Sequence, residues 1–177
     1  GKPVLLETLK PIAIRDGWLW VGTDLSESSS ISEESVATRL LADLSVVTST
    51  ISVSSPVSRG LVGFAARPST ETSQLDFAGL QAIYAQTPGL VADKLKAALE
   101  LVGLCVAALK KKGVIFAYDE AQNLADHADR QQYPLSLLLD LFQSIQKRDI
   151  PFMLALTGLP TLFPKLVEAR TFAERMF

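Results

Sequence analysis

The sequence predicts a single α/β domain that is built on a parallel β-sheet. Short apolar runs at residues 18–23, 114–118 and 152–156 lack the alternation of a half-exposed strand, which is typical of strands buried on both faces of such a sheet. Helical patterns separate these runs, as the crossover connections of a parallel sheet require. With 177 residues, 48% of them hydrophobic, the chain is long enough to bury one core of this kind.

The first predicted elements are a helix over residues 4–15 and the strand over 18–23. Apolar residues recur in the helix at the spacing of one face, but Pro11 lacks an amide hydrogen and is expected to kink or end it there. Gly17 then separates the helix from the strand, which runs up to Asp24.

A second helix is predicted to begin at a capping box formed by Ser30 and Glu33, and to run to about Leu44. Residues 45–73 are rich in Ser, Thr, Pro and Gly and have neither a helical nor an alternating pattern. We therefore expect an ordered but irregular insertion over this stretch.

The longest predicted helix follows Thr87, a candidate N-cap with Pro88 at the first helical position. Its wide apolar face continues to Leu109, and Gly113 ends it ahead of the strand at 114–118.

Two further helices complete the pattern, one over residues 134–147 and one after the turn at 157–160. In a parallel α/β sheet, ligands bind beside the carboxyl ends of the strands. Four polar residues directly follow the strands: Asp24, Asp119, Glu120 and Thr157. We therefore expect the functional site among them.

An apolar strand that ends in Asp-Glu brings together the carboxylates that nucleotide hydrolysis requires. Asp119 can bind Mg²⁺ while Glu120 orients and activates the attacking water, although adjacent acids also begin ordinary solvated loops. Gly1 and Lys2, ahead of the first helix, match the end of the phosphate-binding sequence G-x-x-x-x-G-K-S/T. With Thr157 after the third strand, the features follow the order of a P-loop ATPase.

On these motifs the chain resembles the AAA+ P-loop ATPases, in particular the origin-recognition-like and STAND-like group of bacteria and archaea. The resemblance covers nearly all of the chain. It rests on Gly1-Lys2 as the end of Walker A, residues 114–120 as Walker B with 121–124 behind it, residues 154–160 as the sensor-1 strand and turn, and the closing residues 169–177. It implies a three-layer P-loop NTPase sandwich of the ASCE type, present as a partial AAA+ domain over residues 1–177, cut at both ends and lacking the C-terminal lid.

The resemblance implies ATP and Mg²⁺ as cofactors and assigns a role to each site residue. Gly1 and Lys2 would bind the phosphates, with Lys2 on the β- and γ-phosphates, and Asp119 would bind the metal. Glu120 would act on the water, and Thr157 on the γ-phosphate or the water. For Thr157, a plain helix cap is an equally open interpretation.

The last helix carries two candidates for an arginine finger that reaches the nucleotide of a neighbouring subunit. The resemblance favours Arg175 over Arg170, and it implies a homo-oligomer. Solvated arginines paired with Glu168 and Glu174 remain an equally open alternative. The sequence does not identify the protein or DNA target of such a subunit.

Pro3 departs from the family pattern, because Ser or Thr at this position supplies a hydroxyl ligand to Mg²⁺. Proline fits the first turn of a helix, so the fold is retained while the ligand is lost. The glycine-rich front of the loop is also missing from the sequence, so we expect a fragment that binds ATP poorly or not at all. Two hypotheses follow: an ATP-driven switch or remodelling subunit, and a non-catalytic interaction module from a decayed or truncated P-loop domain.

The composition gives no sign of a nucleic-acid surface or a membrane segment. The formal net charge is −2, and the longest basic run is Lys110–Lys112. Cys105 is the single cysteine, which excludes an internal disulfide. No apolar run approaches the roughly 18 residues that a membrane span needs, so we expect a cytoplasmic protein.

Overall fold

The computed structural model describes residues 2–28, 32–49, 52–57 and 69–176. Its elements are, in chain order, α1 (Lys2–Arg15), β1 (Trp18–Val21), α2 (Glu33–Thr48), β2 (Ser52–Val57), β3 (Ser69–Gln74), α3 (Phe77–Gln86), α4 (Val91–Ala108), β4 (Gly113–Tyr118), the 3-10 turns η1 (Ala121–Asn123) and η2 (Ala128–Arg130), α5 (Pro134–Lys147), β5 (Phe152–Leu156) and α6 (Leu162–Met176). Helices and strands alternate along the body, as the sequence predicts.

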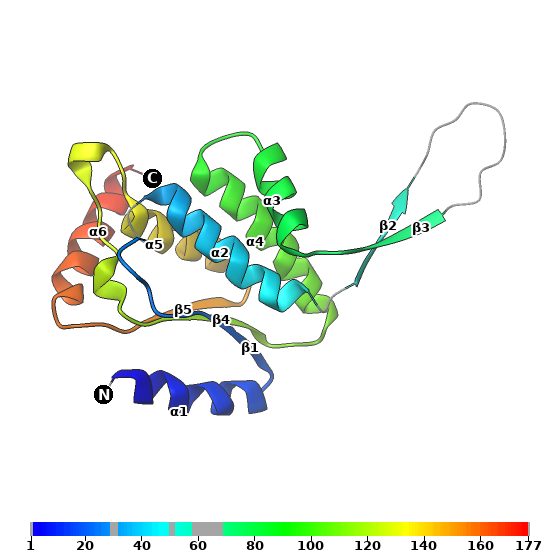
Figure 1. Cartoon of the computed structure of the whole chain (residues 1–177), viewed down its shortest axis with the longest axis horizontal. Coiled ribbons are helices and arrows are strands. Elements are labelled where there is room, and N and C mark those ends of the chain that lie inside the picture. Colours follow the sequence, from blue (N-terminus) through cyan, green and yellow to red (C-terminus); the bar gives the residue numbers. More distant parts are fainter. Residues whose placement is uncertain (1, 29–31, 50–51, 58–68, 177) are drawn as a thin grey trace.

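The strands β1, β4 and β5 form a parallel sheet in the order β1-β4-β5. Helix α1 lies on one face of this sheet, and α2, α4 and α5 cover the other (Figure 1). The prediction of an α/β fold with a parallel sheet is therefore confirmed. Because all three strands run in the same direction, their carboxyl ends lie at one edge of the sheet.

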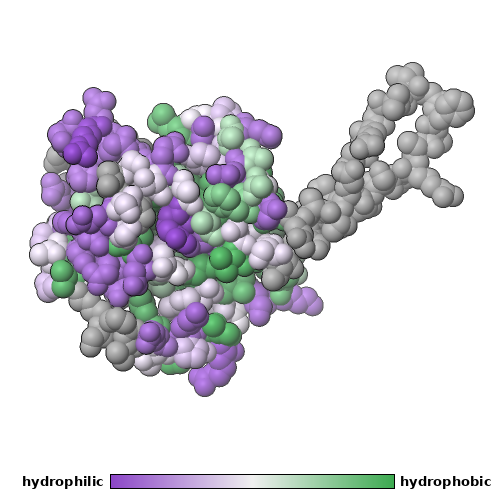
Figure 2. All heavy atoms as spheres, in the orientation of Figure 1, coloured by the Kyte–Doolittle hydropathy of each residue, from purple (hydrophilic) through white to green (hydrophobic). Residues whose placement is uncertain are grey.

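The hydrophobic core lies between the sheet and the helices α2, α4 and α5. Phe116 of β4 is fully buried, and its ring packs against Phe142 and Phe152 with centroid distances of 5.0 and 5.5 Å. Leu95 and Leu99 of α4 are also fully buried. The opposite face is less well covered, since several apolar residues of α1 remain exposed: Leu5, Leu9, Ile12 and Ile14. Figure 2 shows hydrophilic residues over much of the visible surface, with hydrophobic residues in smaller groups.

The first helix reaches Arg15 as predicted, whereas the predicted cap of the second helix is wrong. Helix α1 continues through Pro11 to Arg15. Pro11 has no amide hydrogen to donate to the Glu7 carbonyl four residues earlier. Both residues are exposed, so the helix tolerates the loss of this hydrogen bond. The N-cap of α2 is Ser32, whose side chain accepts a hydrogen bond from the Ser35 amide at 3.0 Å, whereas Ser30 lies outside the described residues.

The segment expected to be irregular, 45–73, contains regular structure. Its first residues continue α2 to Thr48, and β2 pairs with β3 as an antiparallel hairpin from Ser52 opposite Gln74 to Val57 opposite Ser69. Figure 1 shows the two strands extending away from the helices. Thr and Val favour strands, so the mixed composition did not exclude one. The rest of the segment lies outside the described residues.

Helix α3 was not predicted, and it changes the role of Thr87. Thr87 ends α3, where its hydroxyl donates a hydrogen bond to the Ile83 carbonyl at 2.7 Å. Gly89 then adopts φ +114°, which interrupts the helical path, and α4 begins only at Val91. Thr87 is therefore not the N-cap of the long helix.

Candidate functional site

The candidate site lies at the carboxyl ends of the three parallel strands. The backbone after β4 is held from both sides by its neighbours. On one side, the Asp119 amide donates to the Thr23 carbonyl at 3.2 Å, and the Leu25 amide donates to the Asp119 carbonyl at 2.9 Å. On the other side, the Thr157 amide donates to the Tyr118 carbonyl at 2.9 Å. The position of Asp119 is thus fixed by both adjacent strands.

Asp119 is buried, with 5% of the residue exposed, and two donors orient its carboxylate. Its Oδ1 accepts from the Thr157 hydroxyl at 2.7 Å and from the Glu120 amide at 2.8 Å. Within the described part of the chain, no donor contacts its other oxygen. The structure therefore brings together Asp119, Glu120 and Thr157 around the Asp119 Oδ1 atom.

Glu120 adopts a left-handed backbone conformation, with φ 55° and ψ 33°. Few residues other than glycine do so, and such conformations cost of order 1–3 kcal/mol and cluster at functional sites. The turn ends β4 and starts η1, and the Ala121 amide then donates to the Thr157 carbonyl at 2.9 Å. Glu120 is half-buried, and its Oε2 accepts a hydrogen bond from Gln122 Nε2.

Sequence reasoning missed Gln122 as part of the site. Besides Glu120, its side chain contacts the turn after β5, because Oε1 accepts from the Leu159 amide at 3.0 Å. A polar side chain two residues after the acids was a signal for such a contact. The direction of that side chain depends on the left-handed turn at Glu120, which the sequence did not reveal.

Two hollows border the first turns of α1 at this edge of the sheet. One, of about 130 Å³, is lined by Leu6, Glu7, Lys10, Trp20, Gly22, Thr23, Asp24, Ala117 and Asp119. The other, of about 390 Å³, is lined by Leu5, Leu156, Thr157, Gly158, Leu159, Leu162, Phe163 and Leu166. Residues between Leu5 and Lys10 of α1 therefore lie beside Asp119 and Thr157.

Most of the remaining predicted site residues lie outside the described part of the structure. Gly1 lies outside the described residues, as do the side chains of Lys2, the first residue of α1, and Arg175, near the end of α6. The Arg170 side chain is exposed on α6. The structure thus leaves the assignments of Gly1, Lys2 and Arg175 as predictions.

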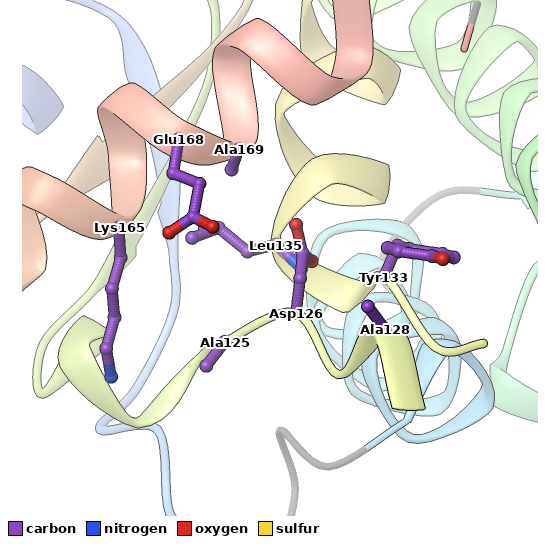
Figure 3. A pocket seen from close by; sticks show the side chains of 8 residues that line it. All are labelled: Ala125, Asp126, Ala128, Tyr133, Leu135, Lys165, Glu168 and Ala169. Carbon is purple, nitrogen blue, oxygen red and sulfur yellow. The ribbon is translucent and has the colours of Figure 1, made fainter. Parts of the chain in front are cut away.

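A separate hollow of about 260 Å³ lies between η2 and α6, and Figure 3 shows Glu168 and Asp126 beside it. The Asp126 carboxylate caps α5, since it accepts from the amides of Leu135 and Ser136 at 3.0 and 3.1 Å. Lys165 donates to the Gln122 carbonyl at 2.7 Å. Asp126 and Lys165 are thus used in structural hydrogen bonds, and the described residues contain no group of three metal-ligating side chains. The strand ends therefore remain the better candidate.

A buried polar cluster supports β4 directly before the acids. The Tyr118 hydroxyl donates to Asp43 Oδ2 at 2.6 Å, and the Arg39 Nε donates to Asp43 Oδ1 at 3.2 Å. Burial raises the pKa of Tyr118, and the hydrogen bond to Asp43 raises the pKa of Arg39. Tyr118 is thus a neutral donor to an ion pair that joins α2 to the end of β4.

Replacing Tyr118 with phenylalanine is expected to lower the free energy of unfolding by about 1–2 kcal/mol, because Asp43 loses a buried donor. Urea denaturation of the variant measures this. As a matched control, Tyr84→Phe removes a hydroxyl that donates to Glu34 in an exposed position, and its effect should stay below about 0.5 kcal/mol. Equal effects of the two substitutions would contradict the buried-cluster interpretation.

No helix within the described ranges is long and apolar enough to cross a membrane. Comparison of the chain with protein-family models, with curated proteins and with solved structures finds no match.

Proposed function

We propose that this chain is the central part of an AAA+ P-loop ATPase module, which binds and hydrolyses ATP and acts as a switch or remodelling subunit. The observation that carries the proposal is the contact between neighbouring strand ends, where the Thr157 hydroxyl orients the buried Asp119 carboxylate. Glu120 stands beside them in a strained turn. A Mg²⁺-binding carboxylate followed by a water-activating carboxylate is the arrangement that ATP hydrolysis uses.

The direction of the crossovers supports the same proposal. The connections from β1 to β4 to β5 pass over one face, whereas α1 lies on the other (Figure 1). Crossovers between parallel strands are right-handed. A strand that preceded α1 and was connected through it to β1, on the opposite face, would therefore lie on the β5 side of the sheet. A phosphate-binding loop between such a strand and α1 would face Asp119 and Thr157, across the hollow that Leu5 and Thr157 line.

The residues present fit Mg²⁺ in part. The second Asp119 oxygen, to which no described residue donates, is the kind of hard ligand that this ion prefers, and bound Mg²⁺ would neutralise charge on the phosphates. Thr157 holds Asp119 in position, and Glu120 can accept a proton from an attacking water. Pro3, in the first turn of α1, has no hydroxyl to offer. That residue favours the second candidate function, a non-catalytic interaction module.

ATP titration of the natural full-length protein in the presence of Mg²⁺ tests the proposal. We expect saturable, Mg²⁺-dependent binding, and tighter binding after Pro3→Thr restores the hydroxyl ligand. Asp119→Asn should weaken the Mg²⁺-dependent binding of ATP about tenfold or more, because even residues that only hydrogen-bond to a metal ligand contribute about tenfold to metal affinity. The exposed Asp129→Asn is the control and should leave binding unchanged.

The two candidate functions predict different outcomes of this titration. If neither the natural protein nor its Pro3→Thr variant binds ATP, the ATPase proposal is overturned and the interaction module is supported. Calorimetry gives the affinity and the stoichiometry in one measurement.

A further inference from the structure

Gln122 connects the two halves of the candidate site through three of its polar groups. Its Nε2 donates to Glu120 Oε2, and its Oε1 accepts from the Leu159 amide at 3.0 Å. Its backbone carbonyl accepts from Lys165 Nζ at 2.7 Å, and Figure 3 shows Lys165 reaching down from α6. Gln122 therefore lies between the Glu120 carboxylate and the turn that joins β5 to α6.

The chemistry of its two neighbours fixes the orientation of the Gln122 amide. A backbone amide only donates a hydrogen bond, and a carboxylate only accepts one. The Gln122 oxygen must consequently face Leu159, and its nitrogen must face Glu120. A flipped amide would lose both bonds, so this orientation follows from the partners. A glutamate at this position would instead place a like charge beside Glu120.

The turn after β5 packs tightly against Gln122. A Cβ on Gly158 would lie 2.6 Å from the side-chain oxygen Oε1 of Gln122 and 3.2 Å from its backbone nitrogen. No larger residue therefore fits without displacing Gln122. One residue earlier, the Thr157 carbonyl accepts from the Ala121 amide at 2.9 Å. Gln122 and the residue before it are therefore in direct contact with the turn at 157–159.

We propose that Gln122 is a positioning residue that couples the Glu120 carboxylate to the turn at 157–159. The inference rests on the proposed ATPase function, in which Glu120 acts on water. Thr157 orients Asp119 from the same turn, so one structural unit sets the positions of both acids. A ligand that contacts the turn would then change the orientation of Glu120 through Gln122, without touching Glu120 itself.

The test measures steady-state ATP hydrolysis by the full-length protein and its Gln122→Ala variant. We expect kcat to fall by about 10- to 100-fold, part of the 10²–10⁴ that a positioned base contributes. KM for ATP with Mg²⁺ should change less than about threefold, because Gln122 is not a proposed phosphate ligand. Gln143→Ala, on the exposed side of α5, is the matched control and should retain wild-type kcat.

A double-mutant cycle separates positioning from a general structural effect. In a Glu120→Gln background, Gln122→Ala should lower kcat no further, since there is no base left to position. Gly158→Ala is the second variant, and it should reproduce the loss of kcat by displacing the Gln122 side chain. Thermal unfolding midpoints within a few degrees of wild type would show that each protein is folded.

The outcomes distinguish this inference from the proposed function. If the wild-type protein hydrolyses ATP but Gln122→Ala keeps kcat within twofold, the coupling through Gln122 is overturned and the ATPase stands. An equal loss of kcat in the wild-type and Glu120→Gln backgrounds also overturns it, because it indicates a structural role. If the wild-type protein does not hydrolyse ATP, the proposed function fails and the inference fails with it.

Discussion

Replacing Gly22 with alanine is expected to lower the free energy of unfolding by about 2–6 kcal/mol, which combines backbone strain with overpacking. Gly22 follows β1 with φ +134°, a conformation that residues with a side chain rarely adopt. An added Cβ would lie 2.6 Å from the carbonyl carbon of Ala117 and 2.8 Å from its amide nitrogen. Because these are backbone atoms of the central strand, they cannot move aside. Domains are stable by only about 5–15 kcal/mol, so the substitution removes much of that margin.

Guanidinium denaturation of the Gly22→Ala protein measures the effect, and Gly17→Ala is the matched control. Gly17 also has positive φ, +92°, but the nearest atom to its added Cβ is Lys112 Cγ at 3.8 Å. The control should therefore show only the conformational cost, about 1–2 kcal/mol. If both variants lose the same stability, the close approach to Ala117 is not the cause.

Replacing Glu120 with glutamine is expected to reduce ATP turnover by about 10²–10⁴-fold, the contribution of a positioned general base. The amide has nearly the shape of the carboxylate and can still accept the bond from Gln122, so the turn should persist. Affinity for ATP with Mg²⁺ should stay within about threefold, because the Asp119 carboxylate is unchanged. Single-turnover hydrolysis and equilibrium binding, measured on the same preparation, separate the two quantities.

Glu27→Gln, at an exposed position before α2, controls for the loss of one negative charge and should hydrolyse ATP normally. Unchanged turnover in the Glu120→Gln variant would remove Glu120 from the reaction. If ATP affinity fell as much as turnover, the result would instead indicate that Glu120 contributes to nucleotide binding.

Sequence patterns predicted the elements that have a single strong periodicity and clear ends. The predicted helix over 134–147 and the strand over 152–156 have the same bounds in the structure as α5 and β5. Both are rich in apolar residues, with a proline at their start: Pro134 is the first helical residue of α5, and Pro151 directly precedes β5. Ser32 was missed as a cap because it lies among other serines that could equally cap a helix. For α2 the local sequence was thus compatible with several positions for the start of the helix.

The site was predictable in its location and not in its internal contacts. The rule that ligands bind at the ends of parallel strands identified Asp119, Glu120 and Thr157, which the structure brings together. The bond between Thr157 and Asp119 depends on the register of β4 with β5, with Tyr118 opposite Leu156. The place of Gln122 depends on the left-handed turn at Glu120. Register and backbone strain arise from tertiary packing, which one sequence does not encode locally.

The free edge of β5 has a consequence for handling the 177-residue chain. Among the described strands, β5 pairs with β4 alone, and Met153 on it is 48% exposed. Phe163 of α6 is 72% exposed and borders the same hollow as Leu5 and Leu156, the last residue of β5. An edge strand with one unpaired side and exposed apolar side chains nearby is a template for pairing with another copy. Self-association of the chain at high concentration should therefore occur through this edge, and a charged substitution at Met153 should help to keep the chain monodisperse.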